Sequence, residues 1–150
     1  FCFRHDRAMS CRRRSAITVL TALLATTATQ AANLEVSVTA LRSEAGTVHV
    51  ALYDSVETFP NGQQYLVDRV VSAKTGVAAF VGLKPGTYAI AIYHDENGNN
   101  DFDQNFIGFP SEGYAFSNGA KAFFGPPDFV DAAFEVGPES TGITIPMTYW

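Results

Sequence analysis

One stretch of the chain carries an oxygen-bearing side chain at every second position. These residues follow an apolar run that ends at His94, and they are Asp95, Asn97, Asn99, Asp101 and Asp103. A curled loop with this spacing can turn several carboxylate and amide oxygens toward one hard cation, and calcium favours such ligands. We therefore predict a calcium site in the 95–103 loop, with calcium as the cofactor and these five residues as its ligands.

The loop differs from a helical calcium-hand loop in three ways. Gly98 comes two residues too early, Asn100 stands where glycine is expected, and Phe106 replaces the bidentate glutamate at the twelfth position. These departures are compatible with a loop that connects strands. In the alternative interpretation, Asn97 and Gly98 form a simple hairpin turn and the acidic side chains are solvated.

His94 raises a catalytic alternative. A small envelope hydrolase could use His94 as a general base together with Asp95, Asp101 or Glu112. Adjacent residues of a strand point to opposite faces, so His94 and Asp95 are not expected to pair. The sequence also contains no Gly-x-Ser-x-Gly elbow, no His-Glu-x-x-His motif, no phosphate loop and no cysteine nucleophile outside residues 1–32. A binding or structural module is therefore favoured over an enzyme.

A long connection rich in aromatic residues follows the acidic loop. Its rings are Phe106, Phe109, Tyr114, Phe116, Phe123, Phe124 and Phe129. Long loops are usually functional or disordered, and this many rings disfavours disorder, so we expect the connection to fold down as a cover. Tyr114, Phe116 and Phe124 could line a surface for a ligand or a sugar. The alternative, which we favour, is that the rings complete the core.

The first 32 residues are typical of a signal peptide that is removed on export. Five arginines precede the apolar run at residues 16–25, and small residues at 29–32 supply a cleavage site. The run is shorter than the roughly 20 apolar residues of a spanning helix. Both cysteines, Cys2 and Cys11, lie in this leader, so the mature chain carries neither a thiol nor a disulfide. We predict a periplasmic or extracellular protein.

Removal of the leader makes the chain strongly acidic. Of 10 Lys+Arg and 15 Asp+Glu, five arginines and Asp6 lie in residues 1–32, which leaves 5 basic against 14 acidic residues and a net charge of −9. Nucleic acids and anionic membranes require clustered Lys and Arg, so neither is an expected partner. We expect residues 33–150 to form one domain without a transmembrane segment, and its partner to be an unknown envelope protein or a small ligand.

Alternating apolar residues predict the strands. Residues 34–40 and 47–53 each show this pattern, and we expect them to be antiparallel neighbours joined by a turn at 43–46. His49 then lies on the surface without a chemical role. The stretch 65–74 is compatible with a strand or a short helix. The last strand contains Pro146, which cannot donate to a ladder and therefore favours an edge position or a bulge.

The stretch 76–92 resembles a pattern found in prealbumin-like and carboxypeptidase-regulatory-like modules. That pattern reads Gly-x-x-x-Phe-x-x-Leu-x-Pro-Gly-x-Tyr, and Phe80, Leu83 and Tyr88 occupy its Phe, Leu and Tyr positions. The resemblance implies that these three side chains pack inside. Tyr88 is also placed to form a tyrosine corner, in which the hydroxyl donates to an upstream backbone group.

A second resemblance covers the whole mature chain. The motifs at 94–99, 105–114, 116–118, 124–127 and 131–134 look like the exported bacterial family catalogued as domain of unknown function 2141. This family implies an exported β domain with no established activity, substrate or catalytic residues. Its usual pattern has glycine where Asn100 stands, and asparagine tolerates the left-handed conformation well enough to keep the turn.

These observations together predict the fold and a broad role. We expect an all-β, antiparallel, immunoglobulin-like or prealbumin-like sandwich of about six to seven strands with a long ordered aromatic loop. The expected function is that of a binding or structural module of the cell envelope, with a calcium-stabilised loop.

Overall fold

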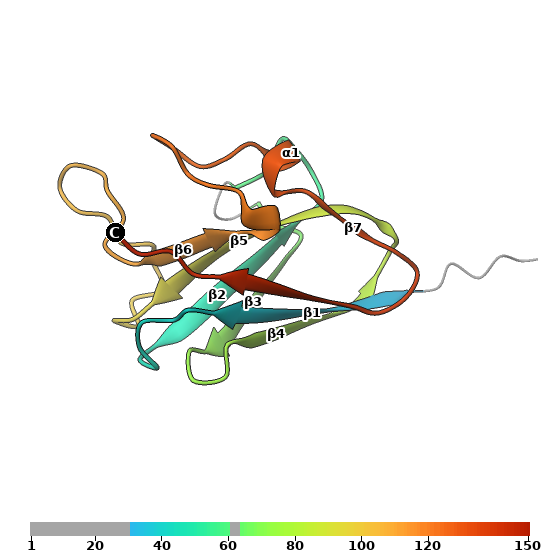
Figure 1. The fold of residues 1–150 in the computed structure, drawn as a ribbon, viewed down its shortest axis with the longest axis horizontal. Coiled ribbons are helices and arrows are strands. Elements are labelled where there is room, and N and C mark those ends of the chain that lie inside the picture. Colours follow the sequence, from blue (N-terminus) through green and yellow to red (C-terminus); the bar gives the residue numbers. More distant parts are fainter. Residues whose placement is uncertain (1–30, 61–63) are drawn as a thin grey trace, which may run out of the picture.

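The computed structural model describes residues 31–60 and 64–150, which form two stacked sheets (Figure 1). The elements in this part of the chain are β1 (Ala32–Thr39), β2 (Thr47–Tyr53), β3 (Val67–Ser72), β4 (Val77–Leu83), β5 (Gly86–Asp95), β6 (Gly113–Phe116), the 3-10 turn η1 (Ser117–Gly119), α1 (Phe129–Ala132), β7 (Phe134–Val136) and β8 (Thr141–Pro146). One sheet has the order β4-β1-β8. The other runs β3-β2-β5-β6, with β7 also paired to β5. The predicted all-β sandwich is confirmed.

The main core lies between the two sheets. Alternate residues of each strand point into it, including Val36 of β1, Val50 of β2, Phe80 of β4 and Ile90 of β5. Strand side chains alternate between faces, so this regular burial follows from the period-two pattern in the sequence. Removal of these apolar surfaces from water is the main term that stabilises the sandwich.

The connection between β1 and β2 crosses from one sheet to the other, so the predicted pairing of these two strands is wrong. β1 pairs antiparallel with β4 and parallel with β8, whereas β2 pairs with β3 and β5. An alternating pattern identifies which face of a strand is buried, but two strands of one core can show the same pattern in different sheets. The turn at 43–46 is therefore an inter-sheet connection.

Other predictions about individual strands hold. The stretch 65–74 contains the strand β3 (Val67–Ser72) and no helix. β8 lies at the edge of the three-stranded sheet and ends at Pro146. Of the predicted signal peptide, residues 1–30 lie outside the described residues, and Ala32 already opens β1. Within the described residues, no helix combines the length and the hydropathy needed to cross a membrane.

Tyr88 forms the predicted tyrosine corner where the chain crosses from β4 in one sheet to β5 in the other. Its hydroxyl donates to the backbone carbonyl of Lys84 at 2.8 Å. Phe80, Leu83 and Tyr88 are all buried, as the strand-turn-strand resemblance implies. The corner therefore fixes the crossing that places β5, and with it the acidic loop, in the five-stranded sheet.

We expect Tyr88→Phe to lower the free energy of unfolding by about 1 kcal/mol, because the Lys84 carbonyl loses its hydroxyl donor while the ring stays in place. Urea denaturation measures the change. Tyr65→Phe is the matched control, since Tyr65 is exposed. Equal effects of the two substitutions would contradict a stabilising role for the corner.

A second apolar cluster covers the opposite face of the five-stranded sheet near η1 and α1. It consists of Tyr53, Phe59, Ala89 and Ala132, with Phe116 and Phe129 packed against it. Buried Ser117 joins these elements, because its hydroxyl accepts from the Ile90 amide at 2.8 Å and donates to the Ala132 carbonyl. The long aromatic connection is thus ordered, with β6 and η1 formed inside it.

Candidate functional site

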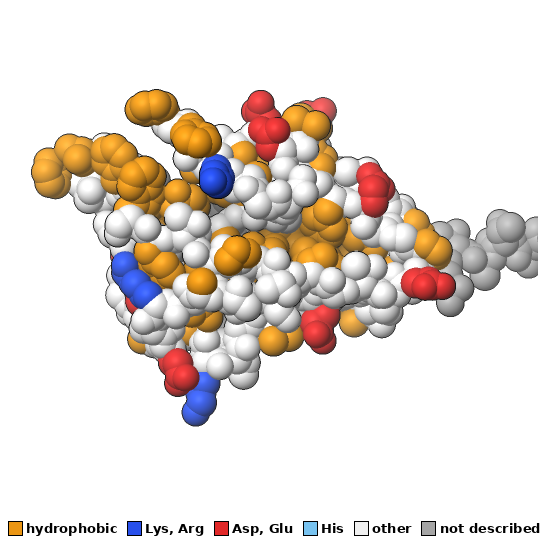
Figure 2. Space-filling view, in the orientation of Figure 1, with side chains coloured by type: hydrophobic (Ala, Val, Ile, Leu, Met, Phe, Trp, Pro, Cys, Tyr) orange, Lys and Arg blue, Asp and Glu red, His pale blue; other side chains and the backbone are white. Residues whose placement is uncertain are grey.

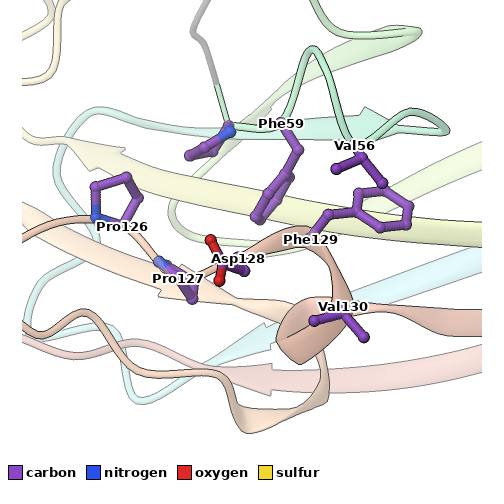
Figure 3. Close-up of a pocket in the computed structure, with 8 residues that line it drawn as sticks. Val56, Phe59, Pro126, Pro127, Asp128, Phe129 and Val130 are labelled. Carbon is purple, nitrogen blue, oxygen red and sulfur yellow. The ribbon is translucent and has the colours of Figure 1, made fainter.

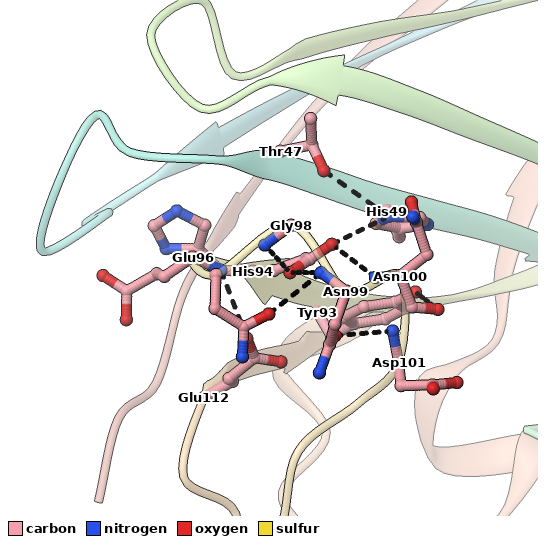
Figure 4. Close-up of polar contacts among 12 residues, drawn as sticks. Thr47, His49, Tyr93, His94, Glu96, Gly98, Asn99, Asn100, Asp101 and Glu112 are labelled. Carbon is pink, nitrogen blue, oxygen red and sulfur yellow. Dashed lines mark hydrogen bonds and ion pairs between the residues drawn. The ribbon is translucent and has the colours of Figure 1, made fainter.

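Asp95 is the centre of the acidic loop. It is the last residue of β5, and its side chain is 0% exposed. One carboxylate oxygen accepts from the backbone amides of Gly98 (2.7 Å) and Asn99 (3.2 Å), and the other accepts from Asn100 (2.9 Å) (Figure 4). Three successive amides therefore turn around one buried carboxylate. Asn100 has a φ of 62°, so the turn expected at this position is present.

Three of the predicted ligands contact one another above this turn. The Asn97 side-chain amide donates to Asp103 at 2.6 Å, and the Asn99 amide donates to both Asp103 oxygens at 3.1 Å. The amide oxygens of Asn97 and Asn99 accept from the backbone amides of Asn99 and Asp101, each at 2.9 Å. Asp101 is exposed, and its carboxylate points away from Asn99 (Figure 4). The structure thus brings Asn97, Asn99 and Asp103 together and leaves Asp101 apart.

Glu112 belongs to the same cluster, although it was not among the predicted ligands. It is buried, and its two oxygens accept from the backbone amides of Glu96 (3.2 Å) and Asp103 (3.3 Å). Burial raises the pKa of the Glu112 carboxyl, the two backbone hydrogen bonds oppose the rise, and the charges of Asp103 and Asp95 raise the pKa further. In the sequence, the one signal for Glu112 is that it is the single acidic residue between Gln104 and Pro127.

The chemistry of this cluster fits a hard cation. Asp103 and the two asparagine amides are already in contact, and turning the amides would direct their oxygens toward the Asp103 carboxylate. The carboxylates of Asp95 and Glu112 lie close by. In the described part of the chain, no three residues of the His, Cys, Asp and Glu types gather closely enough to hold a metal, so a site here depends on the amide oxygens.

The prediction that His49 is a surface residue is wrong. Its ring is buried and stacks on Tyr93, with centroids 4.4 Å apart and an interplanar angle of 12°. Nδ1 lies 3.8 Å from Asp68, and Nε2 lies 3.9 Å from Asp95. β2 has a neighbour on each side, and Tyr93 of β5 stands directly opposite His49. This cross-strand ring covers the outward face that the alternation pattern assigned to solvent.

His94 is a structural residue, and both of its ring nitrogens have partners. Nδ1 lies 2.8 Å from the Tyr149 hydroxyl, and Nε2 lies 2.8 Å from the Ala45 carbonyl. The ring is completely buried. Asp95 points to the other side of the strand, as expected for adjacent residues. Neither nitrogen faces a carboxylate or an opening, so the geometry gives no support to His94 as a general base.

A family comparison extends this description to the whole chain. The model of a family described as uncharacterized proteins conserved in bacteria (DUF2141) matches residues 36–144, which is most of the 150-residue chain. The chain belongs to the DUF2141 family. The match includes the acidic loop and the whole second apolar cluster, in agreement with the resemblance seen in the sequence. No curated protein and no solved structure matches the chain.

In this DUF2141 protein, the three residues predicted for ligand binding occupy two different environments. Tyr114 and Phe116 pack together with centroids 6.0 Å apart, and Tyr114 is buried. The Tyr114 hydroxyl accepts from the Trp150 indole at 3.1 Å. Phe124 is fully exposed. The expectation that the aromatic rings complete the core is therefore met by Tyr114, whereas the rings at the loop tips remain in solvent.

This protein also has a pocket of about 530 Å³ near α1 (Figure 3). It shares no residue with the acidic loop. Its lining residues are Val56, Phe59, Pro60, Pro126, Pro127, Asp128, Phe129 and Val130. Asp128 is the one charged residue in this lining, so the pocket is predominantly apolar.

Proposed function

We propose that this protein is a non-catalytic, exported module of the bacterial cell envelope, and that calcium stabilises its 95–103 loop. The observation that carries the proposal is the mutual contact of the Asn97, Asn99 and Asp103 side chains above the buried Asp95 carboxylate. Export rests on the leader predicted for residues 1–32. Calcium binding rests on the oxygen-rich donor set and on the charge of the cluster.

The charge of the cluster supports a cation. Burial is the largest cause of the raised pKa of Glu112, and the negative charges of Asp103 and Asp95 each raise it further, so both carboxylates disfavour a charge on Glu112. The positive charge of the neighbouring Arg42 guanidinium is paired with Glu96, not with Asp95, Asp103 or Glu112. Glu96 also accepts a hydrogen bond from the Ser43 hydroxyl at 2.6 Å. A divalent ion held by Asp103, Asn97 and Asn99 would offset the negative charge of Asp103 and Asp95 beside Glu112.

An ion in this loop would act on the structure that follows it. The Asp103 carbonyl accepts from the Ser111 amide at 2.9 Å, and the Asp103 amide donates to Glu112. Asp103 therefore closes the base of the loop formed by residues 104–110. Fixing the Asp103 side chain with calcium would stiffen this base, which gives the ion a structural role and needs no catalytic group.

A calcium titration tests the proposal. We expect saturable heat in calorimetry and a higher melting temperature in calcium than in EGTA, since calcium at one hundred times its Kd stabilises a folded protein by about 3 kcal/mol. Asp103→Asn removes a charge at almost constant shape, and we expect it to weaken calcium binding by about tenfold or more.

Asp54→Asn is the control for this titration, because Asp54 is exposed and lies outside the loop. It should bind calcium like the unmodified protein. Absence of heat and of a melting shift at millimolar calcium would contradict the proposed ion. Equal weakening by Asp54→Asn and Asp103→Asn would contradict the location of the site.

A further inference from the structure

Two loops expose large apolar side chains at their tips. The first aromatic loop (residues 104–110) carries Phe106 and Ile107, which are 99% and 62% exposed, and the second aromatic loop (residues 120–127) carries Phe123 and Phe124, of which Phe123 is 78% and Phe124 fully exposed. In Figures 1 and 2, both loops project toward the same end of the molecule, where apolar side chains stand clear of the body. Clustered exposed rings of this size mark an interaction surface, because soluble surfaces rarely carry them.

The first aromatic loop satisfies its own backbone. The Asn105 amide donates to the Phe109 carbonyl at 2.7 Å, and the Gly108 amide donates to the Asn105 carbonyl at 2.9 Å. The Asn105 side-chain oxygen accepts from the amides of Ile107 and Phe109, each at 3.0 Å. Four backbone donors at the tip therefore have partners without water. Pairing of these donors lowers the cost of placing this tip against lipid, because an unpaired backbone group costs several kcal/mol in hydrocarbon.

The charge around the two loops is unlike that of the rest of the chain. Between residues 104 and 127, the charged residues are Glu112, which is buried, and Lys121, which is exposed. Of the 14 acidic residues outside the predicted leader, all except Glu112 lie outside residues 104–127. The loop tips carry no exposed acid, so they can approach phosphate groups, whereas the exposed Asp101 and Asp128 that flank the two loops would be repelled by an anionic surface. The long stem of Lys121 can lie along apolar groups while its ammonium reaches a phosphate.

Trp150 extends the apolar surface beside the first aromatic loop. Its ring packs edge-on against Phe109 at 5.5 Å, and the side chain is 70% exposed. The indole N–H already donates to the Tyr114 hydroxyl. Tryptophan with an apolar ring and a paired N–H is favoured where hydrocarbon meets the headgroups of a bilayer.

We propose that the two aromatic loops dock this protein on a phospholipid bilayer. Phe106, Ile107, Phe123 and Phe124 enter the outer hydrocarbon, and Lys121 stays at the level of the phosphates. The acidic body disfavours anionic lipid, so a zwitterionic surface is the matching partner. This docking is independent of calcium.

Vesicle flotation with the full chain in buffer that contains EGTA tests the proposal. We expect the protein to float with phosphatidylcholine vesicles, and the emission of Trp150, the single tryptophan, to shift to shorter wavelength and to be quenched by brominated lipid. The double variants Phe106→Ser/Ile107→Ser and Phe123→Ser/Phe124→Ser should each lower the partition coefficient about tenfold or more. A thermal melt checks that each variant is folded. If a double variant is not folded, the single variant of the same loop, Phe106→Ser or Phe124→Ser, replaces it.

Val81→Ser is the matched control, because Val81 is an exposed apolar residue on β4 of the other sheet. Its partition should equal that of the unmodified protein. Absence of flotation would overturn the proposal. Flotation that survives in both loop variants would place the contact elsewhere, for example in residues 1–32, and would also overturn it. The proposal would also be overturned if the unmodified protein formed a dimer and did not bind vesicles, while both loop variants were monomeric.

Discussion

Asp95→Ala is expected to lower the free energy of unfolding by about 3 kcal/mol. The carboxylate is completely buried and accepts from the backbone amides of Gly98, Asn99 and Asn100. Hydrogen bonds to a charged acceptor are stronger than those between neutral groups, and alanine removes all three at once. Water can reach the exposed side of the loop and recover part of the loss, which keeps the expected value below the sum of three buried bonds.

Urea denaturation in EGTA measures this loss without a contribution from calcium. Asp95→Asn separates charge from shape, because the amide keeps one oxygen for Gly98 and Asn99 and presents an N–H₂ group to the Asn100 amide. We expect a loss close to that of alanine, since two donors then face each other. A loss below about 1 kcal/mol in Asp95→Ala would contradict the view that this carboxylate holds the loop together.

Local sequence patterns predicted the faces of the strands and the corner at Tyr88. These features depend on residues that are close in the chain: alternation identifies the side of β1 that faces the core, and Tyr88 reaches Lys84 four residues away. Strand pairing depends on distant segments. β1 lies between β4 and β8, and nothing in its own alternation distinguishes this arrangement from pairing with β2.

In the candidate site, too, local spacing predicted some features, and others depend on strand pairing between distant segments. The spacing of Asp95, Asn97, Asn99 and Asp103 predicted one polar loop, and the structure places these residues in one. Glu112 and His49 could not be found in this way, because they reach the loop through pairing of β5 with β6 and with β2. The exposure of Phe106 and Phe124 departs from the favoured expectation that the rings complete the core, since composition indicates that rings favour burial and does not say which rings a particular fold can cover.

The position of the acidic loop also depends on Gly46, which ends the connection between the two sheets. Gly46 has a φ of 69°, and a Cβ built on it would lie 1.9 Å from the Asp95 carbonyl oxygen. No real Cβ atom approaches a backbone oxygen so closely, and the backbone of a paired strand cannot move aside alone. The close approach lets Thr47 begin β2 opposite Asp95. Glycine is therefore required here by both conformation and space.

We expect Gly46→Ala to destabilise the protein by about 4 kcal/mol, more than Asp95→Ala, because alanine adds the steric clash to the cost of a positive φ. Gly98→Ala isolates the second cost, since Gly98 has a φ of 77° but open space around its Cβ position. We expect that control to lose about 1 kcal/mol in the same urea denaturation. Equal losses would show that the approach of Gly46 to Asp95 does not constrain the fold. A much larger loss in Gly46→Ala would show that the close approach at the crossing between the sheets constrains the fold. The position of the Asp95 carboxylate, around which the acidic loop turns, would then depend on this crossing as well as on the acidic residues.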